Sequence, residues 1–432
     1  MVLDLRYGRS SVSLDLDKLG KTQVLLGKEA ERLPDLRAEV LHKLRCPTGV
    51  RSLVEEVTRT RSRRVAIIVN DVTRPTPYAD VLPPLLGEIR RAGVPDTHVT
   101  LVVATGIHRG MTAEELRLTL GGDVCDRYEV ANHDCDDQTR LVHLGRLSFG
   151  TELYVNRLVL EADFVLATGV ISPHYFAGFS GGRKAILPGV SGRGSISHNH
   201  SLMTSKAATV CNLEGNPVHI EMVEAARKVG VHFIVNTVTD GLGKTAGVVA
   251  GDVESAWLEG VEMCSRFVVA PVAREVDVVI ASAGGFPKDI NVYQAQKAID
   301  NAERATRRGG TIVLLAECPE GCGEQTFESW MMNAQSLDDI FSRFAAGFEL
   351  GGHKAYSLAR VLRDKEVILV SSLDQAFVRK LFMTPARSLD QALEMVRSKH
   401  GSEYESVVMP CAGNVIPVPG GDVEDRPILQ TP

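Results

Sequence analysis

The sequence lacks any run of about 18 apolar residues, which is the length that a helix needs to cross a bilayer. Its first residues, MVLDLRYGRSS, alternate polar and apolar side chains, so we expect no secretory signal peptide. It also lacks a basic surplus: 48 Lys and Arg stand against 54 Asp and Glu, a formal net charge of -6, which argues against binding of duplex nucleic acid. We therefore expect a soluble cytoplasmic protein without nucleic-acid or membrane partners.

Cysteine is scarce as well, with 8 residues in a chain of 432. Cys318 and Cys322 are the nearest to each other in sequence, and they do not form a C-x-x-C pair. A soft-metal site would need a second Cys/His pair nearby, and none stands there. The cysteines are therefore expected to be reduced thiols.

The common nucleotide-binding motifs are also missing. The segment Ser172–His200 (SPHYFAGFSGGRKAILPGVSGRGSISHNH) is dense in glycine, which lets backbone approach a ligand closely and present N–H groups to anions. It nevertheless fails the phosphate-loop pattern G-x-x-x-x-G-K-[ST], because Gly182 is followed by Arg183 and Lys184 is followed by alanine. A nucleotide triphosphatase is therefore not expected.

What the sequence does contain is an alternation of short β-branched runs with helical patterns. This alternation predicts an α/β fold of mostly parallel sheets flanked by helices. At roughly 100–200 residues per domain the length predicts two domains. We expect an N-terminal domain of residues 1–270, joined by the C-terminal stretch 405–432, and a C-terminal domain of residues 271–404. The expected strands are Arg64–Asn70, His98–Ala104, Asp163–Gly169, Val231–Val238, Val276–Ser282, Thr311–Ala316 and Glu366–Ser371, and the expected helices include Val81–Ala92, Pro217–Val229 and Gln294–Arg308.

Loops rich in polar residues, glycine and proline follow four of these strands directly. In an open parallel sheet, ligands bind outside the carboxyl ends of the strands, so these loops are expected to meet at one edge. The active site is then expected in the cleft between the two domains, with Lys297 facing it from the second domain. The side chains expected to converge there are Asp71, Arg74, His108 and His174.

The basic residues of these loops each have a structural alternative. His108 precedes Thr112–Glu115, which fits a capping box, so it could be a turn residue before that helix. Lys184 could be a solvated loop lysine. His198 and His200 are two positions apart and point to different faces of a helix, so only one of them is expected to bind a metal.

Gln294 and Lys297 are three positions apart at the start of an expected helix, so they share one face. The partial positive charge at a helix N-terminus favours an anion there. The pair is therefore a candidate carboxylate site, or else an exposed first turn of the kind that lysine commonly occupies.

Taken together, the segments DVTRPTP, TGIHRGMT, SPHYFAGFSGGRKAILPG…SHNH and YQAQKA resemble the nickel-dependent lactate racemase family in order and spacing, and the later GGHKAYSLAR is similar too. The resemblance implies an enzyme that interconverts the enantiomers of a small 2-hydroxy acid by proton-coupled hydride transfer, through a 2-keto acid. It also implies a nickel-pincer nucleotide cofactor (pyridinium-3,5-bisthiocarboxylic acid mononucleotide), and separate biosynthetic proteins that make it.

The resemblance further implies a role for each matching residue. Lys184 tethers the cofactor covalently, and His200 is the nickel ligand. His108 and His174 are the acid/base pair, and an unperturbed histidine pKa of about 6.5 suits proton transfer near neutral pH. The implied cofactor-binding residues are Asp71, Thr73 and Arg74, and the implied substrate-binding residues are Arg74, Gln294 and Lys297.

Some residues and functions stay open at this point. A zinc-dependent hydrolase would use His174, His198 and His200, but the sequence has no H-E-x-x-H motif. A non-catalytic protein that binds small carboxylates would not need a pair of acid/base histidines. Arg183 either contacts the cofactor phosphate or faces solvent, and His353 lies where a residue that shapes the substrate pocket is expected.

Overall fold

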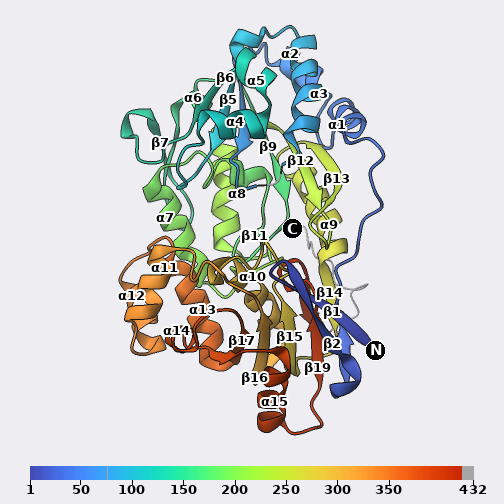
Figure 1. Cartoon of the computed structure of the whole chain (residues 1–432). Helices are drawn as coiled ribbons and strands as arrows, with labels where there is room; N and C mark the ends of the chain where they lie inside the picture. Colours follow the sequence, from blue (N-terminus) through green and yellow to red (C-terminus); the bar gives the residue numbers. More distant parts are fainter. Residues whose placement is uncertain (75, 421–432) are drawn as a thin grey trace. The chain divides into compact units, whose positions relative to one another are not determined.

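A computed structural model describes residues 1–74 and 76–420 of the chain, and its elements are traced in Figure 1. These residues form two compact units. Of the described residues, the first unit is Glu29–Phe267, and the second combines Met1–Lys28 with Val268–Gly420. Among the described residues, none of the helices has both the length and the apolar character to span a bilayer.

The first unit is built on a sheet with the strand order β13-β12-β9-β4-β5-β6. All of its neighbouring pairs are parallel except β12 with the edge strand β13. The chain runs outward from β4 to β6 and then returns to β9 on the other side of β4, which creates a topological switch point between β4 and β9. The strands are β4 (Val65–Asn70), β5 (Val99–Ala104), β6 (Glu129–Asn132), β9 (Phe164–Ile171), β12 (Val231–Thr239) and β13 (Thr245–Gly251), with the small pairs β7 (Leu141–Arg146) with β8 (Glu152–Asn156) and β10 (Pro173–His174) with β11 (Gly178–Phe179) outside this sheet.

The central strands of this sheet are apolar along their length, as strands covered on both faces are. Strand β4 reads VAIIVN, and every residue but the last is buried. Ile67 and Leu101 of the sheet share a core with Leu82 and Leu85 of α3, so the helices bury one face of the strands. The helices of the unit are α1 (Leu36–Arg45), α2 (Leu53–Arg59), α3 (Tyr78–Arg91), α4 (Ala113–Leu120), α5 (Gly122–Arg127), α6 (Arg157–Leu160), α7 (Arg193–Ser201), α8 (Pro217–Val229) and α9 (Ser255–Val268).

The second unit holds a sheet with the order β18-β17-β16-β15-β19-β3, in which every neighbouring pair is parallel. Its core joins Ile280 and Val313 of the sheet to Leu393 of α15 and to Leu5 of an N-terminal hairpin. The elements are β1 (Val2–Tyr7), β2 (Ser10–Asp15), β3 (Thr22–Val24), β14 (Val269–Val272), β15 (Val276–Ser282), α10 (Val292–Ala302), β16 (Thr306–Leu315), α11 (Gln325–Asn333), α12 (Leu337–Ala346), α13 (Gly352–Asp364), β17 (Glu366–Val370), α14 (Gln375–Lys380), β18 (Thr384–Ala386), α15 (Leu389–His400), β19 (Ser406–Met409) and β20 (Ile416–Pro419).

The two ends of the chain differ from the expected domain division. The change of unit falls between Phe267 and Val268, close to the expected boundary at residue 270. However, residues 1–28 fold with the second unit, where β3 forms an edge of the sheet. The C-terminal stretch, expected on the first domain, instead inserts β19 between β15 and β3 and pairs β20 with β14, while residues 421–432 lie outside the described residues. Such pairings join segments that are remote in sequence, so local periodicity does not reveal them.

Strands and helices largely lie where the sequence predicts them, but one helix ends early. The helix expected over Gln294–Arg308 stops at Ala302, and β16 already begins at Thr306. The Thr306 hydroxyl donates to the Ala302 carbonyl (2.8 Å), which satisfies a carbonyl of the last turn. Gly309 has a φ of +75°, outside the helical range, so the helix cannot continue through this position. Residues 306–308 are instead the start of β16.

Candidate active site

Three loops at the switch point carry most of the residues predicted for the site. Asp71 follows β4 directly, His108 lies in the loop after β5, and His174 lies just beyond β9. Because β9, β4 and β5 are adjacent and parallel, these loops leave the sheet at the same edge. The Gly106 N–H donates to the Gly189 carbonyl (2.9 Å), which ties the second loop to the glycine-rich segment.

Asp71 and His108 form a carboxylate–imidazole pair. His108 Nδ1 lies 2.6 Å from Asp71 Oδ2, and the Thr73 hydroxyl donates to Asp71 Oδ1 (2.5 Å). Burial alone would raise the pKa of Asp71, but the hydrogen bonds from His108 and Thr73 and the charge of Arg74 outweigh it and lower this pKa. An ionised Asp71 holds the proton of His108 on Nδ1, so Nε2 is left as the basic atom.

We expect Asp71→Asn to lower kcat by about 10²-fold for any reaction in which His108 is the acid or base, because the amide no longer stabilises the imidazolium form of His108. The substitution keeps the size of the side chain, so KM is expected to change little. Asp80→Asn, which removes a partly exposed carboxylate from α3, is the matched control and should leave kcat unchanged. Wild-type kcat in Asp71→Asn would exclude this role for Asp71.

The loop that carries His108 is held by the predicted capping box. The Glu115 N–H donates to the Thr112 hydroxyl (3.2 Å), and the Thr112 N–H donates to the Glu115 carboxylate (2.8 Å). Arg109 adds two hydrogen bonds to the same carboxylate, at 2.7 and 2.5 Å. Arg109, the residue after His108, is thus fixed to the start of α4.

We expect Thr112→Ala to lower the free energy of unfolding of the first unit by about 1 kcal/mol, the usual cost of losing a threonine cap. Denaturant unfolding followed by circular dichroism measures this change. Thr58→Ala removes an exposed threonine from within α2 and should cost less, because alanine favours a helix. Equal stability of the Thr112→Ala and wild-type proteins would contradict the cap's contribution.

The ring of Phe176 is the common neighbour of three predicted site residues. The ring centroid of His174 lies 4.6 Å from that of Phe176, and the centroid of His200 lies 4.9 Å from it. Lys184 Nζ lies 5.7 Å from the same centroid. His174, Lys184 and His200 are therefore gathered around one aromatic side chain, although they are spread over the glycine-rich segment.

The charges that act on His174 and Lys184 are positive. Burial lowers the pKa of His174 well below its ordinary value, and Lys184, His200 and Arg74 lower it further. Burial likewise lowers the pKa of Lys184 well below its ordinary value, reinforced by Arg183 and Arg74. Both side chains keep some contact with solvent, but the surrounding protein displaces most water from their basic groups. Burial and the neighbouring positive charges therefore both favour the unprotonated forms of this imidazole and this amine.

His198 and His200 both lie on α7 and face different ways, as their spacing predicts. His200 is 8% exposed and packs against Phe176, whereas His198 Nδ1 is bonded to the Thr151 hydroxyl (2.9 Å). The helix covers Arg193–Ser201, and the 3₁₀ turn Leu202–Thr204 follows it. This arrangement does not favour a zinc site built from both histidines.

Gln294 and Lys297 lie together on α10 in the second unit, where Lys297 Nζ donates to Gln294 Oε1 (3.3 Å). The backbone N–H groups of this helix end are occupied, which differs from the expected anion site. Its first two N–H groups donate to carbonyls of the turn 318–322, and the Gln294 N–H donates to the side chain of Asn291. The two side chains, and not the helix end, are therefore what α10 offers to a carboxylate.

Lys354 of α13 anchors the first turn of α10. Its Nζ donates to the Tyr293 carbonyl and lies 4.0 Å from the centroid of that ring. Gln296 Nε2 donates back to the Lys354 carbonyl (2.9 Å). The neighbouring His353 is 5% exposed, and its Nδ1 accepts from the Gly351 N–H (3.1 Å), so His353 belongs to the packing around α13.

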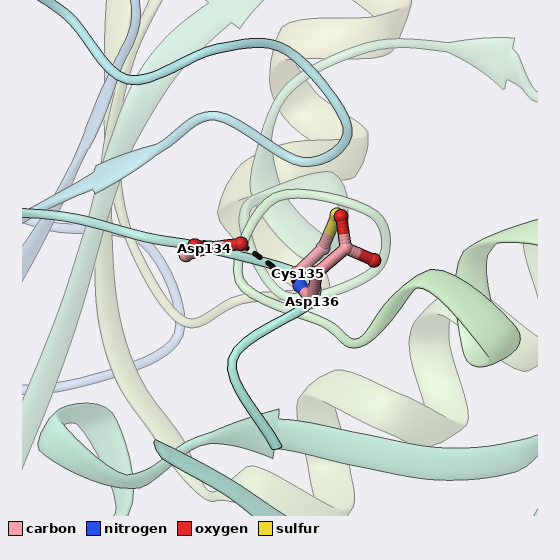
Figure 2. A group of neighbouring side chains, drawn as sticks. All are labelled: Asp134, Cys135 and Asp136. Carbon is pink, nitrogen blue, oxygen red and sulfur yellow. Dashed lines mark hydrogen bonds between the residues drawn. The ribbon is translucent and has the colours of Figure 1, made fainter. Parts of the chain in front are cut away.

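A turn of the first unit brings three potential metal ligands together, as Figure 2 shows. The ligand atoms of Asp134, Cys135 and Asp136 lie within 4.8 Å of one another. Both carboxylates are exposed, and Arg193 donates to the two oxygens of Asp136 at 2.6 Å each. The Asp136 N–H also donates to Asp134 Oδ1 (2.9 Å), so the group is a hydrogen-bonded polar turn.

The parallel sheet and the loops at its switch point are typical of an α/β enzyme. These loops carry side chains that can act as acids, bases and nucleophiles. Residues 7–211 match the family model of the lactate racemase N-terminal domain, and residues 272–416 match that of the lactate racemase C-terminal domain. The chain belongs to the lactate racemase family.

Individual relatives agree with this assignment. A lactate racemase from Thermoanaerobacterium thermosaccharolyticum is 34% identical over 423 residues, which cover 96% of this chain and 98% of that protein. A lactate racemase from Lactiplantibacillus plantarum is 33% identical over 428 residues, with 96% and 99% covered. The structure of the lactate racemase apoprotein from T. thermosaccharolyticum matches 97% of this chain and 100% of that chain, with a TM-score of 0.89 at 32% identity. A Thermotoga maritima protein has the same fold, with a TM-score of 0.63 at 17% identity over 91% of this chain and all of that one.

Proposed function

We propose that the protein racemises a small 2-hydroxy acid such as lactate. Two observations carry the proposal: Asp71 and His108 form a carboxylate–imidazole pair on loops of the sheet edge that also carries His174, and His174, Lys184 and His200 lie around the ring of Phe176. The relatives that share the chain nearly end to end are named lactate racemases, which supports lactate as the first substrate to test.

The side chains fit the nucleotide cofactor that the family resemblance implies. Burial lowers the pKa of the Lys184 amine, which favours covalent attachment because only the unprotonated amine is a nucleophile. The imidazole of His200 is a type of ligand that nickel accepts. Lys184 would hold the cofactor and His200 its nickel, and Thr73 and Arg74 are its proposed further contacts. When bound, the cofactor supplies the hydride acceptor that oxidation at the substrate Cα requires.

The protein's own part in the reaction is proton transfer at the substrate hydroxyl. One histidine takes the hydroxyl proton as the Cα hydrogen leaves with its electron pair, and a planar 2-keto acid results. Two bases are needed because the two enantiomers direct their hydroxyls differently. His108, oriented by Asp71, and the uncharged His174 are suited to accept that proton and to return it.

The substrate carboxylate needs cationic or amide donors. Arg74 of the first unit can bind a carboxylate with two parallel hydrogen bonds. Gln294 and Lys297 of the second unit are the further proposed ligands, and the cleft between the domains stays a prediction. Holding the planar intermediate by its carboxylate keeps it bound while it turns its other face.

Polarimetry on the loaded protein tests this proposal. The chain is expressed together with cofactor-making proteins, and intact-protein mass spectrometry verifies the added mass of the attached cofactor. Pure L-lactate and pure D-lactate are then added in separate reactions. Both solutions should approach zero rotation. The proposal would be overturned if protein with the verified cofactor mass left the optical rotation unchanged, both with lactate and with a panel of other 2-hydroxy acids.

A further inference from the structure

Glu221 of α8 is a buried carboxylate that the proposed chemistry does not use. The residue is 0% exposed, and its hydrogen-bond partners in the described part of the chain are neutral donors. The backbone N–H groups of Phe149 (3.0 Å) and Thr151 (3.2 Å) donate to Oε1. The Thr151 hydroxyl (2.5 Å) and the Asn199 side-chain amide (3.1 Å) donate to Oε2. A carboxylate accepts about four hydrogen bonds, so these donors account for the acceptor capacity of Glu221.

Two of these contacts reach consecutive residues of α7. Asn199 donates directly to Glu221 and also to the Val218 carbonyl of α8 (3.3 Å). Because the one hydroxyl proton of Thr151 goes to Glu221, the hydroxyl oxygen accepts from Nδ1 of His198 (2.9 Å). The carboxylate therefore holds Asn199 directly and His198 through a hydroxyl bridge.

The next residue along α7 is His200, the proposed nickel ligand. Successive residues of an α-helix project about 100° apart, so fixing two of them sets the direction of the third. His200 is 8% exposed, and its ring centroid lies 4.9 Å from that of Phe176. The start of α7 is held separately, because the Ser195 hydroxyl donates to the Glu152 carbonyl of β8 (2.6 Å). Glu221 thus acts on the last turn of the helix, which carries His200.

A second carboxylate of α8 offers a comparison within the same structure. Glu224 binds the same turn between β7 and β8, where it accepts from the N–H (2.9 Å) and the hydroxyl of Ser148. Among the described residues, its hydrogen bonds do not reach α7. Removing the Glu224 carboxylate therefore loosens the turn alone, whereas removing that of Glu221 also releases α7.

We propose that Glu221 is a positioning residue for His200. It fixes the last turn of α7 through the two residues that precede His200, so the imidazole is held against Phe176. The purpose, a rigid ligand for the nickel of the cofactor, rests on the proposed function. The position of the ring, however, is a property of the chain alone and is measurable without cofactor.

Nuclear magnetic resonance of the full, cofactor-free chain tests this. The 12 histidines are labelled with ¹³C at ring Cε1, and spectra are recorded at about pH 8.5, above the ordinary histidine pKa of about 6.5. The signal that disappears in His200→Gln protein identifies His200. The difference in its chemical shift between wild-type and Phe176→Leu protein measures the displacement that the neighbouring aromatic ring causes.

Substitutions on the two helices separate positioning from general packing. In Glu221→Gln the amide has one acceptor oxygen and turns N–H groups toward donors, so the His200 signal should lose most of its displacement. Glu224→Gln should leave the signal at its wild-type position, which a merely structural effect of the turn would not do. Asn199→Ala cuts the direct link to α7 and should shift the signal in the same direction as Glu221→Gln.

In the loaded protein, the same substitution should weaken the retention of nickel. Groups that orient a metal ligand typically contribute about 10–100-fold to metal affinity, so a chelator should remove nickel from Glu221→Gln protein at least about tenfold faster than from the wild type. Elemental analysis measures the metal, and intact-protein mass spectrometry should show the cofactor still attached. Glu224→Gln protein should lose nickel at the wild-type rate.

An unchanged His200 signal in folded Glu221→Gln protein would overturn the proposal, and so would an equal loss of displacement in Glu224→Gln protein. If Glu221→Gln protein does not fold, Asn199→Ala decides the question in the same way. Nickel retention at the wild-type rate would overturn the link to the metal. Failure of the proposed function looks different: the co-expressed wild-type chain would carry no added mass, while the effect of Glu221 on the His200 signal would persist.

Discussion

We expect the Lys184→Arg protein, expressed with cofactor-making proteins, to have the mass of the unmodified chain and no racemase activity above background. Arginine fills a similar space but keeps its proton, so it has no free electron pair with which to form the covalent link. Intact-protein mass spectrometry reads the attachment directly, and polarimetry reads the activity.

The control for this variant is Lys206→Arg, which changes an exposed lysine that follows the same segment. It should carry the same added mass as the wild-type protein and turn over at the same rate. Persistence of the added mass in Lys184→Arg protein would show that another residue holds the cofactor and that Lys184 is not the tether.

Replacing either His108 or His174 by glutamine should lower kcat by about 10²–10⁴-fold, the usual contribution of one acid/base group. Nickel content should stay at the wild-type level, because neither residue is the proposed ligand. The two variants should also differ in kind. In the proposed scheme each histidine serves one enantiomer, so a single turnover of each variant should release 2-keto acid from one enantiomer only, and the preferred enantiomer should be opposite in the two.

The matched control is His143→Gln, an exposed histidine paired with Glu152 on a peripheral strand pair. Its racemisation rate and nickel content should equal those of the wild-type protein. Wild-type turnover in either site variant, or the same enantiomer preference in both, would contradict a scheme with two bases.

Much of the first unit can be predicted from sequence because its strands are central and parallel. Strand β4 is buried on both faces and therefore reads as an uninterrupted apolar run, and a polar loop with Asp71 begins where that run ends. The rule that ligands bind beyond such strand ends then points to His108 and His174. The N-terminal hairpin and β19 fall outside the domain expected for them because their partners are remote in the chain, as with Ser406 beside Thr22.

The side-chain contacts of the site are harder to predict. Nothing in the sequence pairs Asp71 with His108 in particular, because 37 positions separate them and only the adjacency of β4 and β5 joins them. Phe176 reads as one more apolar residue. Arg183 was expected either to contact the cofactor phosphate or to face solvent, but it is 1% exposed, and its guanidinium donates to the carbonyls of Ala177 and Phe179, contacts that no sequence pattern reveals.

The fate of the Cα hydrogen tests the central chemical claim most directly. Unlabelled L-lactate is racemised in D₂O by the loaded enzyme. The D-lactate that forms is isolated, and mass spectrometry measures its deuterium content at Cα. If His108 and His174 handle only the hydroxyl proton, the product keeps its original hydrogen at Cα. Deuterium at Cα in the product would mean that a base removes the Cα proton itself, and racemisation by hydride transfer would be contradicted.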